Sequence, residues 1–196
     1  KNRLIAASTA AGPAFEGARI SRGMRAAAGA IEKVSITDSV KIRIIGNMPP
    51  VGICGTGLID AAAQMLARGI VDDSGKILSR EELAKILPKN LLKRIISENN
   101  QNNFMLAGED STVDRKPLYV TQKDIRELQV GKAAIAAGIK LLERRLGITA
   151  GEIDGVMLAG AFGNFIHPVN AKRIGLLPDL PLEKVKSIGN AACAGA

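Results

Sequence analysis

Aromatic residues, cysteine and histidine are scarce in this sequence. Aromatic residues make up 3% of its 196 residues, and there are two cysteines and one histidine. Two isolated thiols form neither a disulfide framework nor a Cys-x-x-Cys metal site, and with a single histidine they exclude a conventional zinc cluster. The few rings also argue against a base-stacking surface for single-stranded nucleic acid. We therefore expect no metal site in this chain and a reducing, cytoplasmic setting.

Long apolar runs are absent as well. No stretch of about 18 apolar residues is present, so no transmembrane helix is predicted, and no secretory signal opens the chain. The net charge of +8 is spread over short basic pairs rather than one block, for example Lys93-Arg94 and Arg144-Arg145. We therefore expect no membrane partner and no nucleic-acid partner.

The remaining composition, 46% hydrophobic and 23% charged, is ordinary for a globular protein. Hydrophobic periodicity and turn residues predict the order of its elements. We expect strands at 3–7, 31–36, 40–45 and 153–158, helices at about 15–24, 58–66 and 121–146, a turn at 71–77, a capping box from Ser79 to Glu82, a surface loop at 96–104, and short strands between 105 and 120.

Three loops of small residues follow strand-like segments. They are STAAGP at 8–13, GICGTG at 52–57 and GAFGN at 160–164. Glycine at a strand end permits positive φ and close approach of a ligand, and ligands of open α/β sheets bind outside the carboxyl ends of strands. None of the loops is a Walker A or a GxGxxG motif. Tight turns and phosphate or nucleotide binding both remain open at this point.

Few side chains near these loops suit chemistry. Glu16 follows the first loop, where it either holds a cation-bound water or an amine, or is a helix-start carboxylate. Cys54 lies in the second loop, and an inert buried thiol is the simpler interpretation than a reactive one. His167 is favoured as a surface or capping residue over a catalytic base. Thr56 is expected to cap the helix that follows it.

The order of motifs resembles one family. STAAGPAFEGARISRGM, GICGTGLIDAAAQML, VTQKDIRELQVGKAAI, VMLAGAFGNF and IGNAACAGA together resemble the C-terminal ATPase domain of the iron–sulfur reductive activators of corrinoid proteins. The resemblance covers nearly the whole chain. It implies the superfamily of acetate and sugar kinases, Hsp70 and actin, here a ribonuclease-H-like subdomain with a mixed sheet flanked by helices.

The resemblance also implies a nucleotide site. VMLAGAFG is similar to the adenosine motif of that superfamily, in which two small residues pass under the adenosine. GNAACAGA resembles its second connecting helix. The cofactor-binding residues implied are Gly160, Ala161, Phe162, Gly163, Asn164, Gly12, Pro13, Glu16, Gly55, Thr56 and Gly57.

Both phosphate motifs and the cluster cysteines of the family are expected upstream of Lys1. Residues 1–196 are therefore interpreted as a C-terminal ATPase subdomain cut from a longer protein. ATP or ADP with Mg²⁺, and a [2Fe–2S] cluster, are expected of that longer protein, with the cluster outside this chain. Its implied partner is a corrinoid protein whose Co(II) it reactivates. The sequence leaves open whether the chain forms a homodimer.

Two other functions stay open. A small-molecule kinase of the same superfamily needs a carboxylate that activates the acceptor, and Glu16 and Asp60 are the candidates. A non-catalytic interaction module would use the glycine loops only for packing. No catalytic residue is assigned by the sequence.

Overall fold

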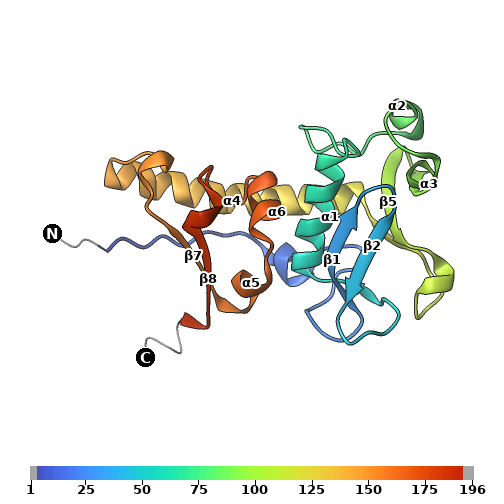
Figure 1. Ribbon diagram of the computed structural model, residues 1–196, viewed down its shortest axis with the longest axis horizontal. Coiled ribbons are helices and arrows are strands. Elements are labelled where there is room, and N and C mark those ends of the chain that lie inside the picture. Colours follow the sequence, from blue (N-terminus) through green and yellow to red (C-terminus); the bar gives the residue numbers. More distant parts are fainter. Residues whose placement is uncertain (1–3, 192–196) are drawn as a thin grey trace. The chain divides into compact units, whose positions relative to one another are not determined.

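The structure is a computed structural model that describes residues 4–191 (Figure 1). The chain divides into two units. Unit 2 runs from Pro13 to Gln129, and unit 1 joins the segment that ends at Gly12 with the segment that begins at Val130. The boundary falls within the long helix α4 (Gln122–Leu146). Each unit is described by itself.

The first part of unit 2 is a three-stranded sheet with one helix packed on it. Strands β1 (Ala30–Ile36) and β2 (Val40–Ile44) form the predicted antiparallel hairpin, and β3 (Gly52–Ile53) pairs with β1 in parallel. Helix α1 (Gly55–Ala67) covers β1. Leu58, Ile59 and Met65 of α1 are almost fully buried, which confirms the predicted apolar stripe of this helix.

The predicted helix at 15–24 is wrong. The chain forms only the short 3-10 helix η1 (Pro13–Glu16), followed by turns. Two glycines explain the difference, because a Cβ on Gly17 would lie 2.5 Å from the Met24 carbonyl oxygen and one on Gly23 would lie 1.8 Å from the Gly17 carbonyl oxygen. The backbone folds back on itself here more tightly than a helix allows.

A second antiparallel sheet has the order β4-β5-β6. Its strands are β4 (Ile95–Glu98), β5 (Gln101–Ala107) and β6 (Leu118–Val120). The surface loop predicted at 96–104 is therefore wrong, since β4 and β5 form a hairpin there. Asn99 and Asn100 have φ of 49° and 60°, and asparagine tolerates this left-handed region of a two-residue hairpin turn. The short strands predicted between 105 and 120 are present as the end of β5 and as β6.

Three short helices complete unit 2: α2 (Arg80–Leu83), α3 (Lys89–Leu92) and the 3-10 helix η2 (Glu109–Ser111). The capping box predicted at the start of α2 is present. Ser79 Oγ accepts a hydrogen bond from the Glu82 amide, and Glu82 Oε2 accepts one from the Ser79 amide at 2.7 Å. Both interactions satisfy amide groups that the helix itself leaves unpaired.

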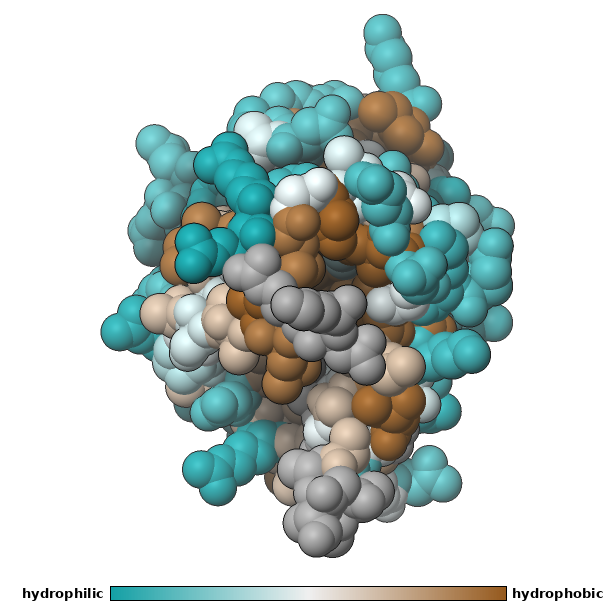
Figure 2. Space-filling model, turned by 90° about the vertical axis from the view of Figure 1, so that its left-hand side faces the viewer, coloured by the Kyte–Doolittle hydropathy of each residue, from teal (hydrophilic) through white to brown (hydrophobic). Residues whose placement is uncertain are grey.

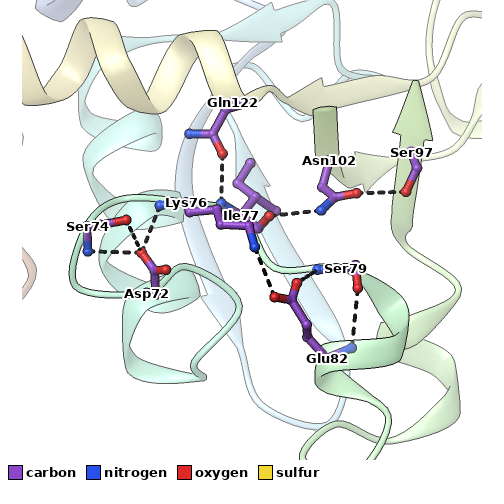
Figure 3. Close-up of polar contacts among 9 residues, drawn as sticks. All are labelled: Asp72, Ser74, Lys76, Ile77, Ser79, Glu82, Ser97, Asn102 and Gln122. Carbon is purple, nitrogen blue, oxygen red and sulfur yellow. Dashed lines mark hydrogen bonds and ion pairs between the residues drawn. The ribbon is translucent and has the colours of Figure 1, made fainter. Parts of the chain in front are cut away.

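The predicted turn at 71–77 is tied to its surroundings by polar contacts (Figure 3). Asp72 Oδ1 accepts hydrogen bonds from Ser74 Oγ at 2.7 Å and from the Ser74 and Lys76 amides at 2.9 Å. The Ile77 amide donates to Gln122 Oε1 at 2.8 Å, and Asn102 Nδ2 donates to the Ile77 carbonyl at 3.0 Å. The turn is thus attached to β5 and to the first turn of α4.

Helix α4 begins and ends as predicted. The Thr121 amide donates to Asp124 Oδ2 at 2.9 Å and Thr121 Oγ1 accepts from the Asp124 amide at 3.2 Å, a reciprocal cap at its start. Gly147 follows its last residue with φ of +70°, the left-handed conformation that commonly terminates a helix.

The other described elements of unit 1 are four short helices and two strands, and the strands form a small parallel sheet. They are the 3-10 helix η3 (Ala150–Glu152), β7 (Val156–Ala159), α5 (Gly160–Phe165), α6 (Pro168–Arg173), the 3-10 helix η4 (Leu182–Lys184) and β8 (Val185–Gly189). Strands β7 and β8 pair in parallel. The strand predicted at 153–158 is confirmed over Val156–Leu158. Residues 4–7 form no strand, and Lys1 to Arg3 of that prediction lie outside the described residues.

The two units differ in how much apolar surface they bury. Unit 2 holds a core that includes Phe104, Ile31 and Leu91, whereas the hydrophobic residues buried in the described part of unit 1 are Ile166, Ala171, Leu176 and Leu180. Unit 1 exposes Leu4, Val130, Leu141, Leu146, Met157, Phe165, Val169, Leu182 and Ile188. Hydrophobic side chains gather near the centre of the face in Figure 2. Strand β7 is therefore only partly buried although its sequence is apolar, since Met157 is 70% exposed.

Within residues 4–191, no helix combines the length and the apolar character that crossing a membrane requires.

Candidate functional site

The candidate site begins where β7 ends. Gly160 follows Ala159 directly, opens α5 and has φ of +83°. A Cβ built on Gly160 meets no described atom within 4 Å. The conformation favours glycine, whereas the space above it is open. A side chain here would enter that space, so the position combines a backbone constraint with an unfilled approach route for a ligand.

The neighbouring strand ends in the same way. Gly189, the last residue of β8, pairs with Ala159 and has φ of +65°. No described atom lies within 4 Å of a Cβ built on it. Two adjacent parallel strands thus finish at their carboxyl ends in glycines with positive φ and open space. This is the edge at which open α/β sheets bind ligands.

Gly189 was missed as a site residue by sequence reasoning. The residues from Gly189 onward were interpreted only as resembling the second connecting helix, and no strand was predicted at 185–189. The segment VKSIG alternates only weakly between apolar and polar residues, so it carries no clear strand signal. Only the parallel pairing with β7 shows that Gly189 ends a strand beside Ala159.

Gly163 holds α5 close to the sheet. A Cβ on Gly163 would lie 3.1 Å from the Leu158 carbonyl carbon and 3.2 Å from the Leu158 Cβ. Ser187 Oγ of β8 donates to the Gly163 carbonyl at 3.3 Å. Helix α5 therefore packs against both strands. Ala161, Phe162 and Asn164 belong to α5 by their backbone, and their side chains lie outside the described residues.

The first loop lies at the unit boundary. Gly12 is exposed, has φ of +70° and has open space around the position of a Cβ. Pro13 opens η1, and its carbonyl accepts a hydrogen bond from the Ala18 amide at 3.1 Å. Glu16 ends η1 with an exposed side chain and pairs with no cation among the described residues.

The second loop is buried. A Cβ on Gly55 would lie 1.9 Å from the Phe15 carbonyl oxygen, and one on Gly57 would lie 2.1 Å from the Ile31 carbonyl oxygen. Backbone therefore packs directly on backbone at both positions, and the start of α1 is brought against η1. Thr56 lies inside the helix and donates to the Glu32 carbonyl at 3.2 Å. The prediction that Thr56 caps α1 is wrong, because the N-cap position is Cys54.

The remaining candidates are placed as follows. Cys54 is 3% exposed, and its thiol donates to the Ile31 carbonyl at 3.3 Å. His167 is an exposed N-cap residue whose side chain makes no capping hydrogen bond. Asp60 is 5% exposed. Cys193 lies outside the described residues. The described residues contain no group of three or more His, Cys, Asp or Glu side chains that could hold a metal ion.

The nucleotide and the iron–sulfur cluster implied by the sequence fit this chain differently. The open glycines at 160 and 189 leave a surface that a Cβ would fill, which suits a flat ring such as adenine. A [2Fe–2S] cluster requires four ligands, and the one described cysteine is buried with its thiol engaged. The described residues therefore offer a surface that suits a nucleotide, and they offer no set of four ligands for the cluster.

Comparison with known proteins identifies the relatives of this chain. The family model described as the C-terminal domain of RACo, the ASKHA domain, matches residues 1–196. The corrinoid activation enzyme RamQ of Eubacterium limosum is 39% identical over 196 residues, which are 100% of this chain and 33% of that protein. A [Co(II) methylated amine-specific corrinoid protein] reductase of Methanosarcina barkeri is 27% identical over 98% of this chain and 34% of that protein.

A solved structure is similar as well. The reductive activator for corrinoid,iron-sulfur protein matches with a TM-score of 0.81 and 40% identity, covering 94% of this chain and 28% of that one. The chain thus spans about a third of the length of the curated relatives it matches.

Proposed function

Because the chain belongs to the family of the C-terminal ASKHA domain of RACo, we propose that it supplies part of the ATP site of a reductive activator of corrinoid proteins. The observation that carries this proposal is the pair of open glycines, Gly160 and Gly189, at adjacent carboxyl ends of parallel strands. Its relatives are named for corrinoid activation and corrinoid-protein reduction. The longer protein of which this chain would be a third is called the parent protein below.

In the proposed site, α5 and the two strand ends lie under the adenosine. Gly160 through Asn164 and Gly189 would form this floor, and Ser187 would keep α5 in place through its hydrogen bond to Gly163. Contact of Gly12, Pro13 and Glu16 with the nucleotide stays a prediction from the sequence. Gly55, Thr56 and Gly57 would act indirectly, by holding α1 against η1.

ATP with Mg²⁺, bound by the parent protein, would supply the free energy that drives an uphill one-electron reduction of Co(II). The cluster that provides the electron would lie in another part of the parent protein. The contribution of this chain would be a conformational one: a ligand shifts an equilibrium by its differential affinity for two states, and closure of subdomains around a ligand is a common form of such a shift.

A reduction assay with the complete parent protein, including its cluster, tests this proposal. Corrinoid protein with its cobalt as Co(II) is mixed with an electron donor and the parent protein. Reduction is followed as the loss of the Co(II) absorption, with and without ATP. We expect reduction to require ATP. Phosphorylation of a small molecule in place of corrinoid reduction would show that the kinase alternative is correct. A parent protein that binds no ATP would show that the chain is an interaction module.

A further inference from the structure

A shallow hollow in unit 2 is lined almost entirely by basic side chains. Its volume is about 250 Å³, and its lining residues are Arg80, Lys89, Leu92 and Lys93. Lys89 and Lys93 are four residues apart, at the first residue and the C-cap of α3, so they lie on the same side of that helix. Arg80 is the first residue of α2. Three basic residues and one leucine thus line one shallow hollow.

Acidic side chains do not neutralise this hollow. Residues 83–97 contain four basic residues and no Asp or Glu. Of the two acids in α2, Glu82 is engaged by Lys76 at 2.9 Å and by the Ser79 amide, and Glu81 is exposed next to Arg80. Among the described residues, Arg80, Lys89 and Lys93 form no ion pair.

The walls of the hollow are held in place. Arg80 Nε donates to the Ile95 carbonyl at 2.6 Å, which fixes the guanidinium against β4. Its terminal nitrogens stay available for other partners. The capping box of Ser79 and Glu82 fixes the start of α2 (Figure 3). Leu91 is fully buried and anchors α3. The Arg80 guanidinium is thus positioned before an anion binds, so it loses little side-chain freedom on binding.

We propose that this basic hollow docks an acidic surface of the corrinoid protein, a proposal that rests on the proposed function. The partner would place one or more carboxylates among Arg80, Lys89 and Lys93 and an apolar side chain against Leu92. Complementary charge increases the rate of encounter and fixes the orientation of transient complexes. Such complexes suit a protein that must bind its partner, transfer an electron and release it. Leu92 in the lining, together with the absence of an aromatic ring there, favours a protein over a nucleic acid as the partner.

The test uses the complete parent protein and measures KM for the corrinoid protein in ATP-dependent reduction. The variant is Lys89→Glu/Lys93→Glu. Its matched control is Lys33→Glu/Lys41→Glu, which changes net charge equally at two exposed, unpaired lysines of the β1–β2 hairpin. At low salt we expect the first variant to raise KM about tenfold or more while the control changes it far less. The difference should close near 0.5 M salt, where screening extends only a few ångströms. ATP affinity should be unchanged.

Several results would overturn the docking site. One is an equal rise of KM in the control, which would indicate general steering by net charge. Another is a defect that persists at high salt, which would indicate damage to the fold. A third is a Lys89- and Lys93-dependent affinity for a single-stranded oligonucleotide in place of the corrinoid protein. Wild-type parent protein that reduces no corrinoid protein would overturn the proposed function itself, which separates the two failures.

Discussion

Asp124 accepts two hydrogen bonds from Ser21, a residue 103 positions earlier in the chain. The Ser21 amide lies 2.8 Å and the Ser21 hydroxyl 3.1 Å from Asp124 Oδ1. The other carboxylate oxygen accepts from the Thr121 amide. Asp124 is fully buried, so one side chain caps α4 and also fixes the turns that follow η1. This contact ties the two ends of unit 2 in sequence to each other.

Replacing Asp124 by Ala should therefore destabilise unit 2 strongly. The change removes a fully buried carboxylate that accepts from the Ser21 and Thr121 amides, and a hydrogen bond to a charged group contributes about 1.5–3 kcal/mol. We expect a loss of about 2–4 kcal/mol, measured as faster hydrogen exchange in residues 13–129. The control is Asp110→Ala at an exposed position, which should change stability by less than about 0.5 kcal/mol. Equal exchange in the two variants would contradict the role of Asp124.

Asp72 should make the stability of its turn depend on pH. Hydrogen bonds from the Ser74 hydroxyl and the Lys76 amide hold the pKa of Asp72 below its usual value. A carboxyl whose folded pKa is depressed stabilises the fold above its unfolded pKa and loses this contribution as pH falls through the folded pKa. Asp72→Asn should thus be less stable than wild type at pH 7, and the difference should shrink below about pH 4.

The neighbouring Asp73 provides the control for this measurement. It is exposed and makes no hydrogen bond among the described contacts, so Asp73→Asn should show little difference at either pH. Urea unfolding at pH 7 and at pH 3 measures both variants. A constant difference for Asp72→Asn across this range would mean that its charge does not matter.

Gly160→Val in the parent protein should weaken ATP binding. The valine side chain would fill the open space at the end of β7. Since Gly160 has φ of +83°, the substitution also strains the backbone, by about 1–2 kcal/mol. Gly147→Val is a matched control, because Gly147 has φ of +70° and the same open surroundings at the end of α4. Calorimetry should show at least a roughly tenfold loss of affinity, about 1.4 kcal/mol, for Gly160→Val alone.

Iron content should not depend on the cysteines of this chain. Cys54 is buried and its thiol is hydrogen-bonded to the Ile31 carbonyl. Cys193 was predicted to have no second cysteine at the spacing of a cluster ligand. Replacing both by Ala in the parent protein should leave its iron unchanged. The loss of the buried thiol should cost about 1–2 kcal/mol of stability. A loss of iron from a double variant that remains folded would show that the cluster depends on a cysteine of this chain.

The isolated chain of 196 residues should be stable in unit 2 and labile in unit 1. The reason is the exposure of Met157, Phe165 and Ile188 around the two-stranded sheet, because a sheet of two strands is marginal without further packing. Hydrogen exchange should be fast in β7 and β8 and slow in β1. The same peptides should be protected in the complete parent protein. Strong protection of β7 in the isolated chain would show that unit 1 needs no further packing.

Local patterns in the sequence predicted elements whose cause is local. The hairpin at β1 and β2, the cap of α2 and both ends of α4 follow from residues that are neighbours in sequence. The errors arose where distant backbone decides. The segment after Glu16 turns because Gly17 and Gly23 approach each other and Met24. Strand β8 was missed because VKSIG has only a weak pattern of its own and pairs with a distant segment of the chain.

The candidate site divides in the same way. Gly160 could be selected from the sequence because it ends an apolar segment, and Gly189 could not, since its meaning depends on the neighbouring strand. The opposite holds for Gly55 and Gly57, which were selected as site residues although their surroundings are other parts of the backbone. Nucleotide contact by these two glycines stays a prediction, whereas their place in packing is visible in the fold.

The glycines of this protein should thus differ in which substitutions they accept. At Gly23, Gly55 and Gly57 a Cβ would overlap backbone atoms, so every other residue type should be rejected regardless of its polarity. At Gly147 the constraint is conformational alone, and asparagine, which enters the left-handed region readily, should be accepted. Gly160 and Gly189 share the conformation of Gly147. A saturation library selected for folding would accept asparagine there, and one selected for nucleotide binding would not.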